Sequence, residues 1–306
     1  MPSEPPADAM HARAVVYFRD LQDRIATAVQ VADGRTAFRE DPWERPGGGG
    51  GRSRILENGG VFEKAGVNFS EVHGEFSPEM AKQMPGDGFA FKATGTSLVL
   101  HPLNPYVPTV HMNFRMLTHG NKAWFGGGAD LTPYYPFRED VIHFHKTWKT
   151  ACERFAPEVE YAKLKRDCDD YFHLKHRHEA RGVGGIFFDA FDAGNLERAF
   201  EFVQAAGDAF LASYLPIVER RRDAIYADRE KRFQEYRRGR YVEFNLIYDR
   251  GTLFGLKTDG RIESILMSLP PTVRYVYDYK PEPDSPEEAL TAYWLKPRDW
   301  ADEATY

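Results

Sequence analysis

The sequence predicts an α+β fold with mainly antiparallel strands, on two observations. Strand-like runs follow one another through short turns, and strands joined by short connections pair antiparallel. Most of these runs precede the longest helical patterns, whereas a parallel sheet needs strands and helices in alternation. The expected strands are 89–93, 97–101, 109–118, 122–125, 185–189 and 241–249.

Helices are expected over 14–32, 138–155, 158–180, 195–214 and 216–238. The first has the apolar stripe of an amphipathic helix packed on the body of the protein, at Phe18, Leu21, Ile25 and Val29. The last is rich in arginine, but its acidic residues lie three or four positions from bases, as on a solvated helix face. With a formal net charge of -6, the chain is expected to have no nucleic-acid partner.

Cysteine content and hydropathy indicate the compartment. The two cysteines, Cys152 and Cys168, are too few for a disulfide framework and lack CxxC spacing, which fits a reducing environment. The sequence contains no run of eighteen apolar residues and does not begin with a signal-peptide pattern. We therefore expect a cytoplasmic location without membrane insertion, and residues 1–10 are expected to be disordered.

The glycine-rich segment 46–54 is expected to be a loop, because five consecutive glycines lose too much backbone entropy in a helix or strand. Two interpretations stay open. The segment is either a flexible surface linker or a lid whose glycines let the backbone approach a ligand. Arg52 and Arg54 at its end slightly favour the lid.

Residues 109–115 carry the first candidate site. Residues two apart in a strand share a face, so one side here is wholly apolar and the other carries Thr109, His111, Asn113 and Arg115. A half-exposed edge strand would also explain a polar face. However, His, Asn and Arg together offer donors suited to carboxylates and a group that titrates near neutral pH. The pattern favours a site for an anionic ligand.

Two more strands are expected to present polar faces to this site. Ser97 and His101 share one face of their strand, and the run 241–249 alternates Tyr241, Glu243, Asn245 and Asp249 with apolar residues. Three such faces are more than surface exposure comfortably explains.

Histidines suggest a second hypothesis, a metal site. His145 lies on the apolar stripe of its expected helix, and His176 follows Phe172 at helical spacing. Such a histidine is more often a hydrogen-bonded core residue than a ligand. With His101 and His111 they form a candidate cluster, but HExxH or another diagnostic spacing is lacking. Metal binding is the minority interpretation.

Seven long blocks run through nearly the whole chain, from about Trp43 to Trp300: GGGGGRSRILENGGVFEKAGVNFS, TVHMNFR, WFGGGADLTPYY, DDYFHLKHRHEARGVGGIFFD, YLPIVERR, RRGRYVEFNLIYDRGTLFGL and RIESILMSLPP. They closely resemble the oxygen-dependent coproporphyrinogen III oxidases of haem biosynthesis. Blocks so long and numerous are far more specific than a short motif.

The resemblance implies one domain over 1–306, with a large antiparallel sheet flanked by α-helices on both sides. It implies oxidative decarboxylation of two propionates of coproporphyrinogen III to vinyls, giving protoporphyrinogen IX, with O2 as acceptor and no obligatory cofactor. It also implies a homodimer with contacts in the segment 241–276, from Tyr241 to Val276.

The resemblance also assigns residues. His111 matches the proposed proton donor, and the residues that match substrate contacts are Ser97, Asn113, Arg115, Asp259, Gly260 and Arg261. Asp259 stands where relatives commonly have glycine, so its role is less secure than that of Arg261. Four histidines match residues sometimes assigned to a divalent metal in this family: His101, His111, His145 and His176.

In the mechanistic hypothesis, the carboxylate of Asp249 engages the pyrrole N–H of the substrate. This interaction makes the ring electron-rich enough to react with O2. A pyrrole peroxide then removes hydrogen from the propionate and CO2 leaves, while His111 and Arg115 stabilise the developing charges. Two alternatives stay open: an O2-activating metalloenzyme with a His cluster, and a non-catalytic tetrapyrrole carrier.

Overall fold

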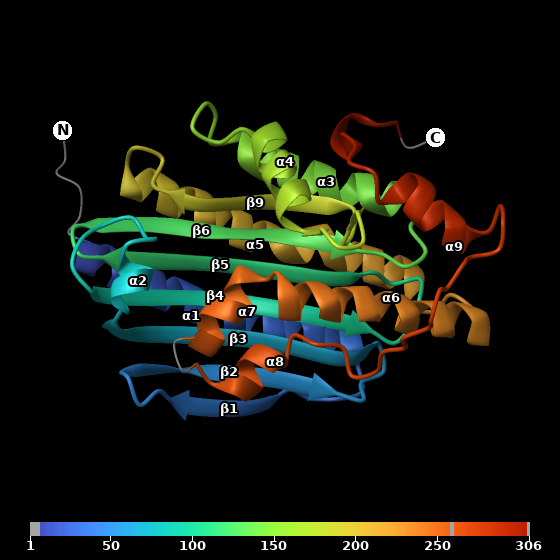
Figure 1. The fold of residues 1–306 in the computed structure, drawn as a ribbon, viewed down its shortest axis with the longest axis horizontal. Coiled ribbons are helices and arrows are strands. Elements are labelled where there is room, and N and C mark those ends of the chain that lie inside the picture. Colours follow the sequence, from blue (N-terminus) through green and yellow to red (C-terminus); the bar gives the residue numbers. More distant parts are fainter. Residues whose placement is uncertain (1–6, 258–259, 305–306) are drawn as a thin grey trace.

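A computed structural model describes residues 7–257 and 260–304. One antiparallel sheet forms its centre, with seven strands in the order β1-β2-β3-β4-β5-β6-β9 (Figure 1). The strands of this sheet are β1 (Arg39–Glu44), β2 (Gly49–Glu57), β3 (Phe62–Glu75), β4 (Ala90–Pro102), β5 (Thr109–His119), β6 (Lys122–Thr132) and β9 (Gly184–Phe191). A separate two-stranded ribbon joins β7 (His173–Leu174) to β8 (Glu179–Ala180).

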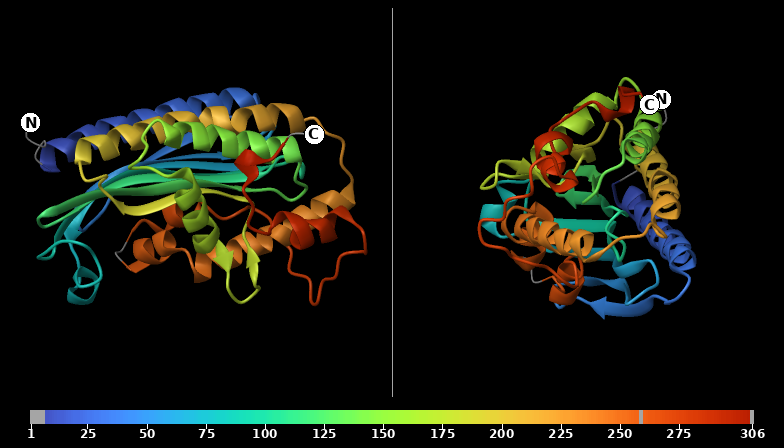
Figure 2. Two further views of the ribbon diagram at one scale, coloured as in Figure 1. Left: turned by 90° about the horizontal axis from the view of Figure 1, so that it is seen from above. Right: turned by 90° about the vertical axis from the view of Figure 1, so that its right-hand side faces the viewer.

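Helices cover both faces of the sheet (Figure 2). The long α1, α3 and α5 form a layer on one face, and α4, α6, α7 and α8 lie over the other. The helices are α1 (Ala7–Asp33), α2 (Pro78–Ala81), α3 (Arg138–Glu153), α4 (Tyr161–Tyr171), α5 (Leu196–Arg221), α6 (Asp228–Ile247), α7 (Arg250–Lys257), α8 (Ile262–Leu266) and α9 (Pro286–Ala289), with a π-helical turn (Leu290–Trp294) and a 3-10 turn (Trp300–Asp302) after them. The predicted α+β fold, a large antiparallel sheet flanked by helices, is confirmed.

The main core lies between the sheet and the layer of α1, α3 and α5. On β5, the apolar side predicted from alternation is fully buried, at Val110, Met112, Phe114 and Met116. Burying a side chain of this size contributes roughly 1.5–3 kcal/mol. Since this face is fixed in the core, the strand must present its polar residues to the opposite side.

Helix α1 carries the expected stripe on the core, but it begins earlier than the sequence suggested. It starts at Ala7, and Met10 is fully buried. The predicted disorder of residues 1–10 is therefore wrong for 7–10, because Met10 continues the apolar stripe by one more turn. Residues 1–6 lie outside the described part of the chain.

The predicted glycine loop is wrong for residues 49–54, which belong to β2. Its glycines are needed for close packing. A Cβ at Gly50 would lie 2.3 Å from the Trp43 carbonyl oxygen, and one at Gly51 2.3 Å from the Trp43 ring. The backbone hydrogen bonds of β2 to β1 and β3 outweigh the conformational entropy that glycine loses in a strand.

Arg52 and Arg54 tie β2 to its neighbours rather than facing a ligand. Each lies 2.7 Å from the carboxylate of Asp23 on α1, and Arg54 also pairs with Glu40 on β1 at 3.0 Å. Their engagement in ion pairs removes the argument for a lid.

Two expectations in the second half of the chain are also wrong. The run 241–249 is not a strand, because α6 continues to Ile247. Its buried stripe includes Arg237, which pairs with Glu179, and apolar periodicity does not detect a buried arginine. The helix expected over 158–180 ends at Tyr171 and is followed by the β7–β8 ribbon. No helix in the described ranges has the length and apolar character needed to cross a membrane.

Candidate active site

A cavity of about 410 Å³ lies between the sheet and the helices α6 to α8. Strands β4, β5, β6 and β9 form its floor, and the end of α4 closes one side. It brings together five of the predicted catalytic and substrate-binding residues, in three separate segments: Ser97, His111, Asn113, Arg115 and Asp249. The polar face of β5 thus forms part of the floor of a cavity, and β5 is not an exposed edge strand.

Strand register sets the order of the polar groups on this floor. Ser97 on β4 pairs directly with Asn113 on β5, so their side chains are neighbours. On the other side of β5, Gly126 is opposite Arg115. A Cβ at Gly126 would lie 3.0 Å from an Arg115 guanidinium nitrogen, so this glycine leaves room for the guanidinium.

His111 is held by a buried carboxylate. Asp130 occupies the position on β6 that pairs with His111, and His111 Nδ1 donates to Asp130 Oδ1 at 2.9 Å. The side chain of His111 is 19% exposed, whereas that of Asp130 is 1% exposed. The hydrogen bond fixes the ring orientation and leaves Nε2 as the ring nitrogen for a ligand.

Arg181 supplies the charge that keeps Asp130 ionised. Its guanidinium lies 2.7 Å from Asp130 Oδ1 and donates to Asn245 at 2.9 Å. Burial by itself raises the pKa of Asp130, but the charge of Arg181 and the hydrogen bond from His111 outweigh it, so the pKa is lowered. Phe172 lies under the guanidinium, whose carbon is 4.1 Å from the ring centroid.

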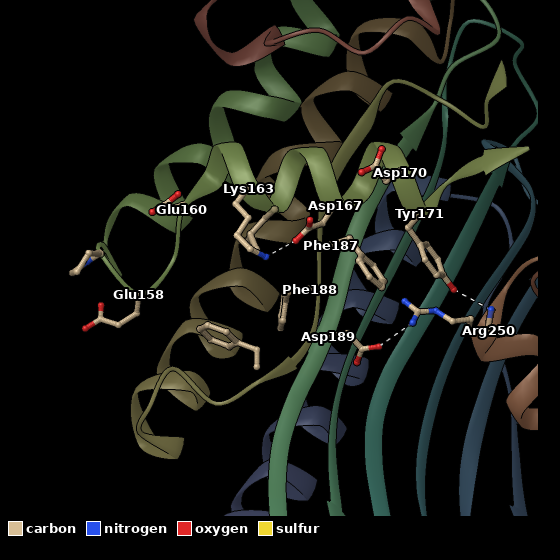
Figure 3. Close-up of a pocket in the computed structure, with 13 residues that line it drawn as sticks. Glu158, Glu160, Lys163, Asp167, Asp170, Tyr171, Phe187, Phe188, Asp189 and Arg250 are labelled. Carbon is tan, nitrogen blue, oxygen red and sulfur yellow. Dashed lines mark hydrogen bonds and ion pairs between the residues drawn. The ribbon is translucent and has the colours of Figure 1, made fainter. Parts of the chain in front are cut away.

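Two arginines of the cavity share a carboxylate of the protein. Asp189 on β9 lies 2.9 Å from the Arg115 guanidinium. It also lies 3.7 Å from the guanidinium of Arg250 (Figure 3). Arg250 begins α7, and its guanidinium carbon lies 4.8 Å from the centroid of the Tyr171 ring. The site therefore holds two guanidinium groups that suit carboxylates.

Asp249 lines the cavity and also caps α7. Its Oδ2 accepts from the backbone N–H of Thr252 at 2.7 Å and from the Thr252 hydroxyl at 2.9 Å. Its Oδ1 accepts from the Tyr171 hydroxyl at 2.9 Å. A carboxylate has about four acceptor positions, so one remains for a ligand N–H.

Two other predicted substrate contacts, Gly260 and Arg261, do not line the cavity. Arg261 forms an ion pair with Asp41 on β1, and Gly260 donates its N–H to the Gly255 carbonyl at 2.8 Å. Asp259 lies outside the described residues. The structure thus gives Arg261 a partner within the protein.

The four candidate metal ligands are not assembled into one site. Within the described ranges, no group of three or more His, Cys, Asp or Glu side chains has metal-binding geometry. Each ring has its own protein partners: His101 bonds to Ser268 and Thr109, His111 to Asp130, His145 to Val183 and Tyr161, and His176 to Glu243 and Tyr248. These histidines do not fit a common metal ion.

Burial also distinguishes these histidines. His145 is fully buried, and burial lowers its pKa to about 3, while the pKa of fully buried His101 also lies well below its usual value. Both are therefore neutral core residues, as a lone histidine on an apolar face usually is. His176 lies between β7 and β8 rather than on a helix.

Four charged residues of the site were missed by sequence reasoning: Asp130, Arg181, Asp189 and Arg250. For Asp130 a signal existed, because extending the strand that was expected to end at 125 would have placed it beside β5. Arg181 and Asp189 reach the site through pairings that no local pattern reveals.

A family model described as Coproporphyrinogen III oxidase matches residues 13–300. The match covers the whole sheet, the helices on both faces and every residue placed in the cavity above.

Proposed function

Because the chain belongs to the coproporphyrinogen III oxidase family, we propose that it converts two propionates of coproporphyrinogen III to vinyls with O2 as the electron acceptor. The observation that carries this proposal is the cavity in which His111 lies on the same floor as Arg115. A tetracarboxylate needs guanidinium groups, and charge-assisted hydrogen bonds are about twice as strong as neutral ones.

The reaction can be balanced for one propionate. The side chain loses CO2 and the two electrons and hydrogen of a hydride, which leaves a vinyl group. O2 takes the two electrons, that hydrogen and one proton, and becomes hydrogen peroxide. One O2 is consumed per vinyl, and a proton must be delivered within the site.

Arg115 and Asn113 bind the propionate in this proposal. They lie two residues apart on one strand, and Arg115 donates to Asn113 Oδ1 at 3.2 Å, which orients the guanidinium. Ser97, opposite Asn113, adds a hydroxyl donor. Such fixed donors hold the reacting carbon in one place, which is a large part of catalysis.

His111 handles the proton. Its Nδ1 is taken by Asp130, so Nε2 faces the substrate. An imidazole can both accept and donate a proton, and the ionised Asp130 stabilises the ring when it is protonated.

Asp249 accepts the pyrrole N–H. Tyr171 and Thr252 hold its carboxylate in place, and the remaining acceptor position serves the ring nitrogen. A carboxylate beside the N–H raises the electron density of the pyrrole, which favours direct reaction with O2. We propose no obligatory metal, since the substrate is itself redox-active.

A homodimer completes the proposal. Apolar side chains are unusually exposed in 241–276, and these are Leu246, Ile247, Leu256, Ile262, Tyr275 and Val276. Exposed apolar side chains of this kind are candidates for an interface between two copies of the chain. We expect the protein to have a mass of twice 35.0 kDa in solution, and we expect the Ile247→Glu variant to shift it towards the mass of a single chain.

The test is an anaerobic-to-aerobic assay with coproporphyrinogen III, following vinyl formation, CO2 and O2 uptake with and without chelator. We expect all three to begin only when O2 is admitted and to be unaffected by the chelator. Loss of activity on chelation and recovery with one metal would instead indicate the metalloenzyme. Binding without O2 uptake would indicate a carrier.

A further inference from the structure

Asp189 carries an inference that rests on the proposed function and deepens it. We propose that its carboxylate is a resident competitor that occupies the arginine site before a substrate propionate does. By this competition it lowers the affinity for every carboxylate ligand and helps the product, which has fewer carboxylates, to leave.

The geometry is that of a carboxylate bound as a ligand would be. Asp189 Oδ1 lies 2.9 Å from Arg115, and Oδ2 lies 3.7 Å from Arg250. All three side chains face the same cavity. A propionate that binds Arg115 must therefore replace Asp189.

The contact is weak enough to be replaced. Side chains of Asp189 and Arg115 are 36% and 35% exposed, and that of Arg250 is 61% exposed. Ion pairs that water reaches contribute only about 0–1 kcal/mol. By contrast, the pair of Asp130 with Arg181 is almost completely buried and is not exchangeable in this way.

Local backbone structure places Asp189 at this point. The next residue, Ala190, has φ of 49°, a conformation uncommon for residues other than glycine, and its N–H donates to Asp189 Oδ1 at 3.1 Å. Across the ladder, a Cβ at Gly126 would lie 2.8 Å from Asp189 Oδ1. A strained residue and a glycine together make room for this carboxylate.

A second cavity gives Asp189 somewhere to move. It has a volume of about 570 Å³ and shares four lining residues with the first: Tyr171, Phe187, Asp189 and Arg250 (Figure 3). Figure 3 shows Glu158, Glu160, Asp167 and Asp170 along α4 and the turn before it. These acids disfavour a polycarboxylate there, whereas the single carboxylate of Asp189 keeps Arg250, which lines both cavities, beside it.

Competition changes during the reaction. Coproporphyrinogen III has four carboxylates, and protoporphyrinogen IX has two. The ligand therefore competes less well with Asp189 after each decarboxylation. Without the Asp189 charge, both the substrate and the product are expected to bind more tightly.

The test compares Asp189→Asn with Asp192→Asn. The asparagine keeps the shape and the acceptor for the Ala190 N–H but lacks the charge. Asp192, three residues further on, is exposed and accepts from the Gly194 N–H, so its variant matches the change in net charge. The probe is coproporphyrin III, the oxidised tetracarboxylate, whose Kd is measured by fluorescence quenching.

We expect Asp189→Asn to lower the Kd about threefold, which corresponds to ~0.7 kcal/mol and lies within the range of such an exposed pair, and Asp192→Asn to leave it unchanged. The tetraamide of the same porphyrin should show no gain, because it has no carboxylate to compete. Asp189→Ser provides the same test if the asparagine variant does not fold.

An unchanged or higher Kd in a variant with the wild-type melting temperature would overturn the role of Asp189 and leave the proposed function intact. Failure of the wild-type protein itself to bind the probe or coproporphyrinogen III would instead refute the proposed function. An equal gain in Asp192→Asn would reduce the effect to net charge and also overturn the inference.

Discussion

His111 and Asp130 occupy paired positions on neighbouring strands, and the His111 Nδ1 is 2.9 Å from the Asp130 carboxylate. The carboxylate is buried with Arg181 behind it. A cavity histidine is thus oriented by a charge that water does not reach, which is a common arrangement for a group that exchanges protons.

Asp130→Asn should lower kcat by about 10²-fold or more with a small change in KM, because the ring loses its orientation and the stabilisation of its charged form. It should also destabilise the fold by roughly 3–5 kcal/mol, since Arg181 is left as an unpaired buried charge. Steady-state kinetics and chemical denaturation measure the two effects.

The double variant Asp130→Asn with Arg181→Met separates them. It removes the unpaired charge and should recover much of the stability without recovering kcat. Recovery of kcat together with stability would show that Asp130 serves the fold alone.

Arg115→Ala should lower kcat/KM by roughly 10–100-fold, the scale of one charge-assisted hydrogen bond of about 1.5–3 kcal/mol. Arg115→Lys should recover only part of it, because a lysine cannot reproduce the planar fork. Ser97→Ala, which removes a neutral donor from the same floor, serves as the comparison and should cost less. A larger effect of Ser97→Ala would argue against Arg115 as the main anchor.

Asp249→Asn tests whether the charge or the cap matters. Asparagine caps helices as well as aspartate, so α7 and the melting temperature should be nearly unchanged. Loss of the charge beside the pyrrole N–H should nevertheless reduce kcat by at least about 10²-fold. If turnover is near normal in this variant, Asp249 is a structural cap only.

The free energy of unfolding should decrease as the pH is lowered, because of His145. Its pKa is about 3 in the folded protein, against the ordinary value of 6.5, so the unfolded chain binds a proton that the folded one does not. The contribution is complete above about pH 6.5 and decreases towards pH 3, by ~1.4 kcal/mol per pH unit for one proton. Fully buried His101 acts in the same direction.

Urea denaturation between pH 5 and pH 7.5 checks this expectation. His145→Gln should be less stable than the wild type at pH 7.5. As the pH is lowered, however, its free energy of unfolding should decrease less steeply, by the slope that one bound proton contributes. An identical slope in the two proteins would mean that His145 is not held neutral by the fold.

Local patterns were sufficient for β5 and insufficient for α6. Alternation along β5 correctly placed His111, Asn113 and Arg115 on one face, because successive side chains of a strand point to opposite faces of the sheet. The same reasoning misplaced 241–249 in a strand. The buried stripe of α6 is partly arginine, which is stable there only through carboxylates distant in the sequence, such as that of Glu63 beside Arg238.

Contacts between residues that are distant in the sequence could not be predicted from the sequence alone. Asp130 and Arg181 are 51 positions apart, and nothing in their own segments indicates the pairing. Asp249 lies in the cavity although the strand expected to carry it does not exist, because the N-terminus of α7 delivers it instead. The predicted cytoplasmic location stays a prediction.

The ratio of CO2 released to O2 consumed tests the central claim most directly. With coproporphyrinogen III and the wild-type protein in the presence of a chelator, we predict one CO2 and one vinyl group per O2 consumed. No CO2 should be released before O2 is admitted. His111→Ala, folded as judged by its melting temperature, should release no CO2 in the same time. Release of CO2 under strict anaerobiosis, or near-normal release by His111→Ala, would contradict the account.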